Sequence, residues 1–268
     1  MTGIAAHIGQ FLERRHAQEL SAELDRSRDE YIALVGHEIR TPLTSIGSYT
    51  ELMLDDPDLL PEQRVTMLQV VRRNVSKLHT IIDKLLDIAG LQAGRITVDP
   101  EQMDLTAVLR AGTAAAQEDV AGKNIDLALE LPPQAVLWGD SRRLQQVVEE
   151  LVANAFTWVN DGGRVIAAVT TDGPITQLTV SNTGPVIPDA ERERMFQRFF
   201  RTTAAGLGGI PGTGLGLSLA RTIVEQHGGT LTATSQAAPE GTTLTVRLPT
   251  EPPAPPTGVV GPDHSHSC

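Results

Sequence analysis

A regular spacing of apolar residues runs through much of the first 93 positions of this chain. From Leu68 to Ala89 these residues recur at alternating steps of three and four, which is typical of a coiled coil or a four-helix bundle. The segment from Ile32 to Met53 has the same spacing. We expect two antiparallel helices joined at residues 55–62, and because each carries one apolar stripe, two copies of the chain should pair into a four-helix bundle. The predicted stripes are Ile32, Gly36, Ile39, Leu43, Ile46, Thr50 and Met53, and Leu68, Val71, Val75, Leu78, Ile82, Leu85 and Ala89.

Residues 96–249 have a different pattern, in which helical stretches alternate with short runs rich in β-branched residues. The predicted strands are ITVD, IDLALEL, RVIAAVTT, ITQLTVSN, GTLTATS and TTLTVRL, and the predicted helices cover residues 104–121, 141–159, 189–197 and 214–227. The fold class expected is α+β: a helical hairpin followed by a two-layer α/β domain with a mostly antiparallel sheet.

Charge and composition narrow the possible functions. A net charge of -11 argues against a nucleic-acid surface, which needs clustered Lys and Arg. The single cysteine, Cys268, leaves no internal disulfide. No apolar run approaches the roughly 18 residues of a membrane span, and no secretion signal is found, so we expect a cytoplasmic protein that reaches a membrane only through a separate partner. Residues 250–268 are rich in Pro and are predicted to form a disordered tail.

The run HEIRTPL, which begins at His37, places a histidine on the outer side of the first predicted helix. His37 and Thr41 are four residues apart and share an exposed face, with Glu38 beside the histidine. Pro42 lacks the N–H that would bond the carbonyl of Glu38, so it should loosen the turn that carries His37. A lone exposed histidine is usually incidental, but this combination of residues indicates a phosphoacceptor.

Four groups of residues in the second region predict a nucleotide site. Glu150 and Asn154 are four apart on one helix, so a carboxylate and an amide face the same point, as Mg²⁺ and phosphate oxygens require. A strand ends at Asn182 and turns through Gly184, which would hold a polar side chain at the floor of a pocket.

The other two groups are a cluster of phenylalanines and a glycine-rich run. The phenylalanines in MFQRFFR are either core anchors or the hinge of a lid. The run GLGGIPGTGLGL would let backbone amides approach phosphates at a helix N-terminus, and because no Lys follows the glycines it is not a P-loop. The residues concerned are Phe196, Phe199 and Phe200, and Gly212, Gly214 and Gly216.

Taken in order, HEIRTPL, the Asn-bearing helix, the Gly turn, the Phe pair and GTGLGL resemble the sensor histidine kinases of two-component signalling, over about residues 28–249. The resemblance implies a dimerisation and phosphotransfer domain at 28–95 and an ATP-binding domain of the gyrase/Hsp90-like (Bergerat) fold at 96–249. Residues 1–27 resemble the exit helix of a GAF-type sensor domain.

The resemblance also implies roles for individual residues. His37 would be phosphorylated from ATP, Glu38 would assist its attack, and Thr41 would act in dephosphorylation of the partner. Asn154 would be a Mg²⁺ ligand. The implied partners are a second copy of the chain and the receiver domain of a response regulator, whose Asp takes the phosphoryl group. The other implied nucleotide-binding residues are Glu150, Asn182, Gly184, Phe199, Gly212, Gly214 and Gly216.

Three positions depart from the family pattern. Asn182 stands where the family has an Asp that accepts the adenine amine, Val186 stands where a second Gly follows, and Thr157 stands where a basic residue is usual. A hydrogen bond to a neutral acceptor contributes about 0.5–1.5 kcal/mol, against about 1.5–3 for a charged one. We therefore expect ATP binding about tenfold weaker than with Asp.

Two alternatives stand beside the histidine kinase. One is a pseudokinase or scaffold that only binds or dephosphorylates a response regulator, which the altered adenine pocket favours. The other is an ATPase or a Ser/Thr kinase of the same fold, because Glu150 sits where such enzymes keep a catalytic base.

Overall fold

The computed structural model describes residues 32–33, 35–56, 58–93, 97–119, 124–207, 213–237 and 240–251. These residues form two compact units. One unit contains the described residues up to Ala89 together with residues 197–215, and the other contains residues 90–196 and those from 216 onward. The predicted sensor remnant at 1–27, Gly212 and the chain beyond residue 251 lie outside the described residues.

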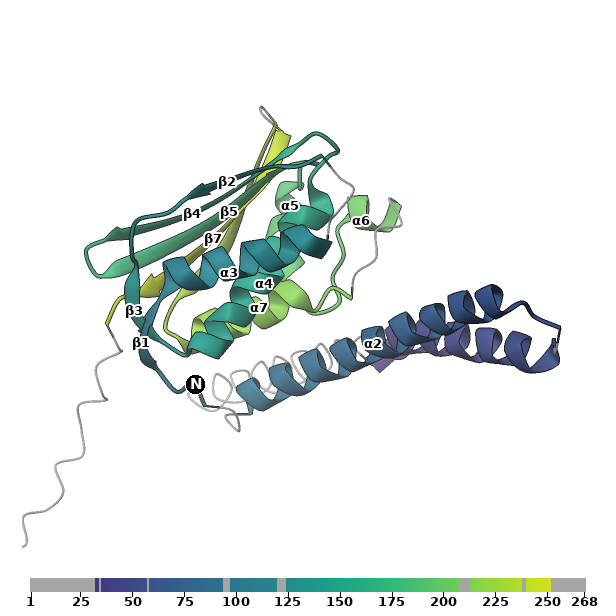
Figure 1. Cartoon of the computed structure of the whole chain (residues 1–268). Helices are drawn as coiled ribbons and strands as arrows, with labels where there is room; N and C mark the ends of the chain where they lie inside the picture. Colours follow the sequence, from purple (N-terminus) through teal and green to yellow (C-terminus); the bar gives the residue numbers. More distant parts are fainter. Residues whose placement is uncertain are drawn as a thin grey trace, which may run out of the picture. The chain divides into compact units, whose positions relative to one another are not determined.

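The first unit contains a hairpin of two helices, one over residues 35–55 and the other, α2, over Pro61–Gln92 (Figure 1). Their connection falls at the predicted place. α2 begins at Pro61, where the missing N–H is harmless because the first amides of a helix have no partner within it. A hydrogen bond of 3.2 Å from Asn74 Nδ2 to Ser45 Oγ joins the two helices.

The single chain covers one side of α2 and leaves part of the predicted stripe, which a second copy is expected to cover, exposed. Ile81 and Ile88 are buried, whereas Leu68, Val75 and Ile82 are 51%, 38% and 43% exposed. Apolar residues occur on two neighbouring sides of this helix. Because both sides fit an alternation of three and four, the spacing could not select the side that the single chain covers.

The first helix shows the same arrangement. Pro42 is buried, while Ile32 and Leu43, which belong to the stripe predicted to pack against a second copy, are 55% and 56% exposed. Thr50 is exposed as well. Pro42 does not end the helix, which continues through it to residue 55.

The second unit has two layers, a five-stranded sheet and helices over one of its faces (Figure 1). β2 runs parallel to β4 and the other neighbours are antiparallel, as the sequence largely predicted. The strands, in sheet order, are β2 (Asp126–Glu130), β4 (Arg164–Asp172), β5 (Ile175–Thr183), β7 (Glu240–Pro249) and β6 (Thr230–Ala237), and the covering helices are α3 (Leu105–Asp119), α4 (Ser141–Trp158) and α7 (Gly216–Gln226).

The core lies between these two layers. Alternate residues of β5, such as Leu178 and Val180, are buried under the helices, because side chains of a strand point to opposite faces in turn. α4 places Leu144 and Leu151 against the same core, and burial of one such side chain stabilises the fold by about 1.5–3 kcal/mol.

Several local predictions were wrong. The run ITVD gives no strand within its described residues 97–99, and a short antiparallel pair of strands, β1 (Glu101–Asp104) and β3 (Val136–Gly139), was missed. The expected helix at 189–197 is divided into α5 (Asp189–Arg192) and a 3₁₀ turn, η1 (Arg194–Phe196). A further short helix, α6, covers Thr203–Leu207. Thr250, expected in the tail, bonds through its backbone to Pro174 and Trp138.

No helix within the described parts of the chain combines the length and the apolar character needed to cross a membrane.

Candidate functional site

The helix over residues 35–55 presents His37 to solvent. Thr41 is also exposed, and its hydroxyl donates a hydrogen bond of 3.2 Å to the carbonyl oxygen of His37. Glu38 is half-buried. The predicted shared exposed face of His37 and Thr41 is therefore confirmed, whereas the adjacent Pro42 is buried.

α4 carries Glu150 and Asn154 four residues apart on one side, and both side chains are half-buried. Asp140 caps the start of this helix, because its carboxylate accepts a hydrogen bond of 3.0 Å from the backbone N–H of Arg143. Thr157 is exposed, and its hydroxyl bonds the carbonyl oxygen of Ala153 at 2.7 Å.

Asn182 lies near the end of β5 and is 6% exposed. Its amide nitrogen donates a hydrogen bond of 3.3 Å to the carbonyl oxygen of Thr183. A carbonyl oxygen can only accept a hydrogen bond, so the side-chain amide of Asn182 must point its nitrogen, not its oxygen, toward Thr183. The amide oxygen of Asn182 is therefore the group left for another donor.

Gly184 brings the end of β5 against the end of α4. A Cβ at this position would overlap the carbonyl oxygen of Trp158 and lie 2.9 Å from Nδ2 of Asn182. The backbone N–H of Gly184 donates to the carbonyl oxygen of Glu240 at 3.2 Å. Only glycine permits this approach, so the Asn-Thr-Gly turn holds Asn182 close to the helix that carries Asn154.

The segment over residues 197–215 contains Phe199 and Gly214. Phe199 is 5% exposed and has a left-handed backbone with φ 58°, which is uncommon for a residue other than glycine. It is the sort of outlier that is found at functional sites. Gly214 lies two residues before α7, which begins at the predicted phosphate-facing Gly216.

Arg221 of α7 holds η1 in place. Its guanidinium bonds the carboxylates of Glu193 and Glu225 and lies 5.2 Å from the ring centre of the buried Phe196. The bond with Glu193 is the main cause of the raised pKa of Arg221. Only the spacing of Arg221 and Glu225 on one helix could have been seen in the sequence.

The structure thus groups the predicted residues by unit. His37, Glu38 and Thr41 share the first helix, and Phe199 and Gly214 share one segment of the same unit. The remaining described residues belong to the second unit: Glu150 and Asn154 on α4, Asn182 and Gly184 at the end of β5, and Gly216 at the start of α7.

Two family models match the chain. The His Kinase A (phospho-acceptor) domain matches residues 27–94, and the histidine kinase-, DNA gyrase B-, and HSP90-like ATPase matches residues 139–252. A structure of the mycobacterial sensor histidine kinase MprB is 30% identical with a TM-score of 0.51, over 57% of this chain and 99% of that one. The chain belongs to the sensor histidine kinases. The matched ATPase family supports the use of ATP.

Two further relatives show how much of a sensor histidine kinase is present. MprB from Mycobacterium leprae, a signal transduction histidine-protein kinase/phosphatase, is 34% identical over 85% of this chain and 45% of its own length. The chain thus spans less than half of that relative. The histidine kinase ThkA, in a crystal structure with the response regulator protein TrrA, is 26% identical with a TM-score of 0.64, over 82% of this chain and 61% of that one.

One residue of this sensor histidine kinase that the sequence analysis missed is His227, at the end of α7. It is 7% exposed, its Nε2 accepts the backbone N–H of Asp140 at 3.0 Å, and its Nδ1 donates to the carbonyl oxygen of Ile223 at 2.8 Å. These bonds need the neutral ring, and burial lowers the pKa of His227. His227 thus ties α7 to the residue that caps α4.

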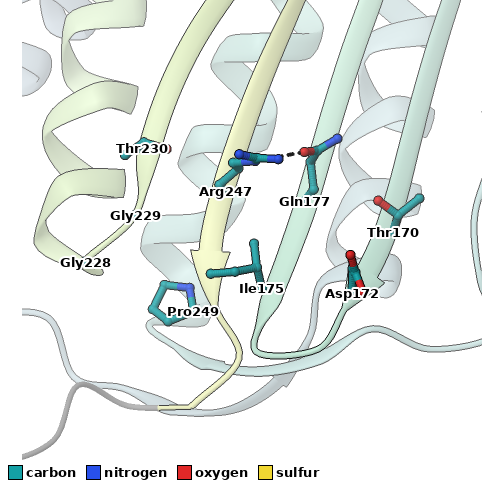
Figure 2. A pocket seen from close by; sticks show the side chains of 9 residues that line it. All are labelled: Thr170, Asp172, Ile175, Gln177, Gly228, Gly229, Thr230, Arg247 and Pro249. Carbon is teal, nitrogen blue, oxygen red and sulfur yellow. Dashed lines mark hydrogen bonds between the residues drawn. The ribbon is translucent and has the colours of Figure 1, made fainter.

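A hollow of about 520 Å³ lies at the opposite end of β5 from Asn182 (Figure 2). Arg247 and Gln177 stand side by side in it and share a hydrogen bond of 3.0 Å. None of the predicted nucleotide-binding residues lines this hollow, so it is separate from the predicted adenine pocket.

Proposed function

We propose that this chain is an ATP-dependent protein histidine kinase that phosphorylates itself on His37 and passes the phosphoryl group to an aspartate of a response regulator. The observation that carries the proposal is the exposed position of His37 on a helix matched by the phospho-acceptor family, in a chain whose other matched domain belongs to an ATPase family. Exposure matters because the imidazole must reach a phosphate that another domain holds.

In the proposed reaction a neutral imidazole nitrogen of His37 attacks the γ-phosphorus of ATP. A nitrogen–phosphorus bond forms, the bond from the γ-phosphorus to the bridging oxygen breaks, and ADP leaves with that oxygen. Glu38, the adjacent acid, would assist by taking the proton from the imidazole. Thr41 would act in a separate reaction, the dephosphorylation of the response regulator.

The adenine base would bind at the end of β5. The amide oxygen of Asn182 would accept the exocyclic amine, since Nδ2 is already bonded to Thr183. Gly184 has no side chain, so no side-chain atoms of this residue enter the proposed adenine-binding position at the end of β5. Gly216, at the start of α7, would let backbone amides approach the phosphates. The predicted nucleotide-binding roles of Phe199, Gly212 and Gly214 are part of the same proposal.

Asn154 would hold Mg²⁺, with Glu150 one turn away on the same face of α4. A hard cation that takes only one or two oxygen ligands from the protein, and the rest from phosphates and water, fits a single amide and a nearby carboxylate. When bound, the ion would supply positive charge to neutralise the phosphates. The half-buried position of both side chains fits groups that stay in reach of a ligand.

A homodimer is part of the proposal. Leu68, Val75 and Ile82 are exposed at intervals of seven residues along α2, which is the repeat of a coiled-coil seam. A monomer would leave this stripe in water. A second hairpin would cover it and produce the four-helix bundle.

The response regulator is the proposed acceptor of the phosphoryl group. Support comes from the relative ThkA, whose crystal structure contains a response regulator protein. We also propose a phosphotransfer domain at 28–95 and a catalytic domain at 96–249, supported by the family matches at 27–94 and 139–252. A cytoplasmic site of action belongs to the same proposal, because the reaction draws on ATP.

The test is incubation of the purified chain with Mg²⁺ and ATP labelled on the γ-phosphate. Acid-labile label on the chain supports the histidine kinase. The neutral Asn182 favours a second candidate, the scaffold or phosphatase, which would bind a response regulator without acquiring label. Acid-stable label on a partner would instead support a Ser/Thr kinase that uses Glu150 as its base.

A further inference from the structure

The two helices of the hairpin are joined by a polar contact in the middle of their length. Asn74 Nδ2 donates to Ser45 Oγ at 3.2 Å and to the carbonyl oxygen of Val70 at 2.9 Å. Both donor positions of the amide are thus used, one within α2 and one across to the other helix. Ser45 and Asn74 are each partly buried.

This contact lies on the covered sides of the helices. On the first helix Ser45 follows the buried Pro42 by three residues, and on α2 Asn74 precedes the buried Ile81 by seven. Apolar neighbours attract one another in any register, so they do not fix how far one helix has slid along the other. A partly buried polar pair favours one register, because a slip breaks the hydrogen bond between the helices.

The contact also sets the position of His37 along the axis of α2. Ser45 is eight residues after His37, which is about 12 Å along the helix axis. Because the helices are antiparallel, the residue of α2 level with His37 is about eight beyond Asn74, near Ile82. A slip of one turn would move His37 by about 5.4 Å along α2.

Pro42 lies between the contact and His37. It provides no N–H to the carbonyl of Glu38, so one backbone hydrogen bond of the intervening turn is missing. The part of the helix before Pro42, which carries His37, is therefore held less firmly by its own backbone. Its position depends more on contacts with α2. The Ser45 to Asn74 bond is such a contact, directly beyond the proline.

We propose that Ser45 and Asn74 are positioning residues, whose hydrogen bond fixes the register of α2 against the helix that carries His37. The inference rests on the proposed function, because its consequence is the placing of His37 for phosphoryl transfer. The register itself is a property of the hairpin and can be measured without any reaction.

The first measurement is disulfide cross-linking in the full chain with Cys268→Ser. Tyr49→Cys with Val70→Cys tests the native register, since these positions lie one turn from the contact on each helix. Tyr49→Cys with Met67→Cys tests a register displaced by about one turn. We expect only the first pair to form with Asn74 present and both pairs to form with Asn74→Leu. The same strong preference for the first pair in Asn74→Leu would overturn the inference.

The second measurement is the rate of label transfer from ATP to the chain. Asn74→Leu should label at least about fivefold more slowly at an unchanged or higher melting temperature, because an apolar residue packs well but specifies no register. The exchanged pair, Ser45→Asn with Asn74→Ser, restores a hydrogen bond across the helices and should recover most of the rate. The control Ser76→Ala, at an exposed position of α2, should match the wild type.

The outcomes separate the two proposals. If the wild type acquires no label but the cross-links shift in Asn74→Leu, the kinase assignment fails and the register assignment stands. If the wild type labels and Asn74→Leu keeps both its register and its rate, the kinase assignment stands and the positioning role is wrong.

Discussion

Phe199 donates its backbone N–H to the carbonyl oxygen of Gly214 at 2.9 Å, and both residues have left-handed backbone angles, with φ 58° and 66°. A Cβ at position 214 would lie 2.8 Å from Cα of Phe199. The contact closes the base of the segment that leads into α7, whose start is predicted to face phosphate. Glycine is required there by both the angle and the approach.

We expect Gly214→Ala to weaken ATP binding by at least about tenfold. The left-handed angle costs about 1–2 kcal/mol for alanine, and the overlap with Phe199 adds to it. Gly173→Ala is the matched control, because Gly173 also has a positive φ, 55°, but open space around it. Calorimetric titration with ATP measures the difference, and equal affinities of the two variants would contradict this role of Gly214.

Stability should depend on pH through His227. Burial lowers its pKa in the folded state, so between that pKa and the ordinary value of about 6.5 the unfolded chain binds more protons. The free energy of unfolding contributed by the neutral ring should be fully present above about pH 6.5 and decline as the pH falls below it.

His227→Leu tests this dependence. The variant leaves the N–H of Asp140 without its acceptor, so it should be less stable by about 1–3 kcal/mol at pH 7.5. Its deficit relative to the wild type should shrink between pH 6.5 and 5. Urea unfolding at each pH gives both numbers, and a constant deficit over this range would show that His227 does not titrate as described.

Asn182→Asp should tighten ATP binding by about tenfold, because a charged acceptor contributes about 1–2 kcal/mol more than a neutral one. Asn160→Asp adds the same charge at an exposed site after α4 and should leave the affinity unchanged. Titrations with ATP and GTP measure affinity and base preference together. Absence of ATP binding in both the wild type and Asn182→Asp would refute the kinase assignment.

Dimer formation should depend on the exposed stripe of α2. Ile82→Asp would place an unpaired charge in the proposed seam and should give monomers. Ser76→Asp, on the same helix at an exposed polar position, should remain dimeric. Sedimentation velocity distinguishes the two, and an unchanged dimer of Ile82→Asp would contradict the proposed bundle.

The sequence predicted the hairpin and the sheet because both rest on local periodicity. It singled out His37, Asn182 and the glycines as candidate site residues because each belongs to a short motif. It did not reveal contacts between residues far apart in the chain. His227 reaches Asp140 across 87 positions. The strands β1 and β3 have only four residues each, which is too short for a clear alternation of apolar and polar residues. The spacing did not distinguish the side of α2 that the single chain covers from the stripe left for a second copy, because apolar residues on both sides recur at the same steps. Only packing shows that Ile81 is buried and Ile82 is exposed in one chain.

The most direct measurement is the site of phosphorylation. The chain offers a matched pair of histidines on one hairpin, both exposed: His37, within HEIRTPL, and His79, on α2 and outside the motif. After incubation with Mg²⁺ and γ-labelled ATP, we expect acid-labile label on the wild type and on His79→Gln and none on His37→Gln, with all three proteins equally dimeric. Label that persists in His37→Gln would contradict the assignment of His37 as the phosphoacceptor.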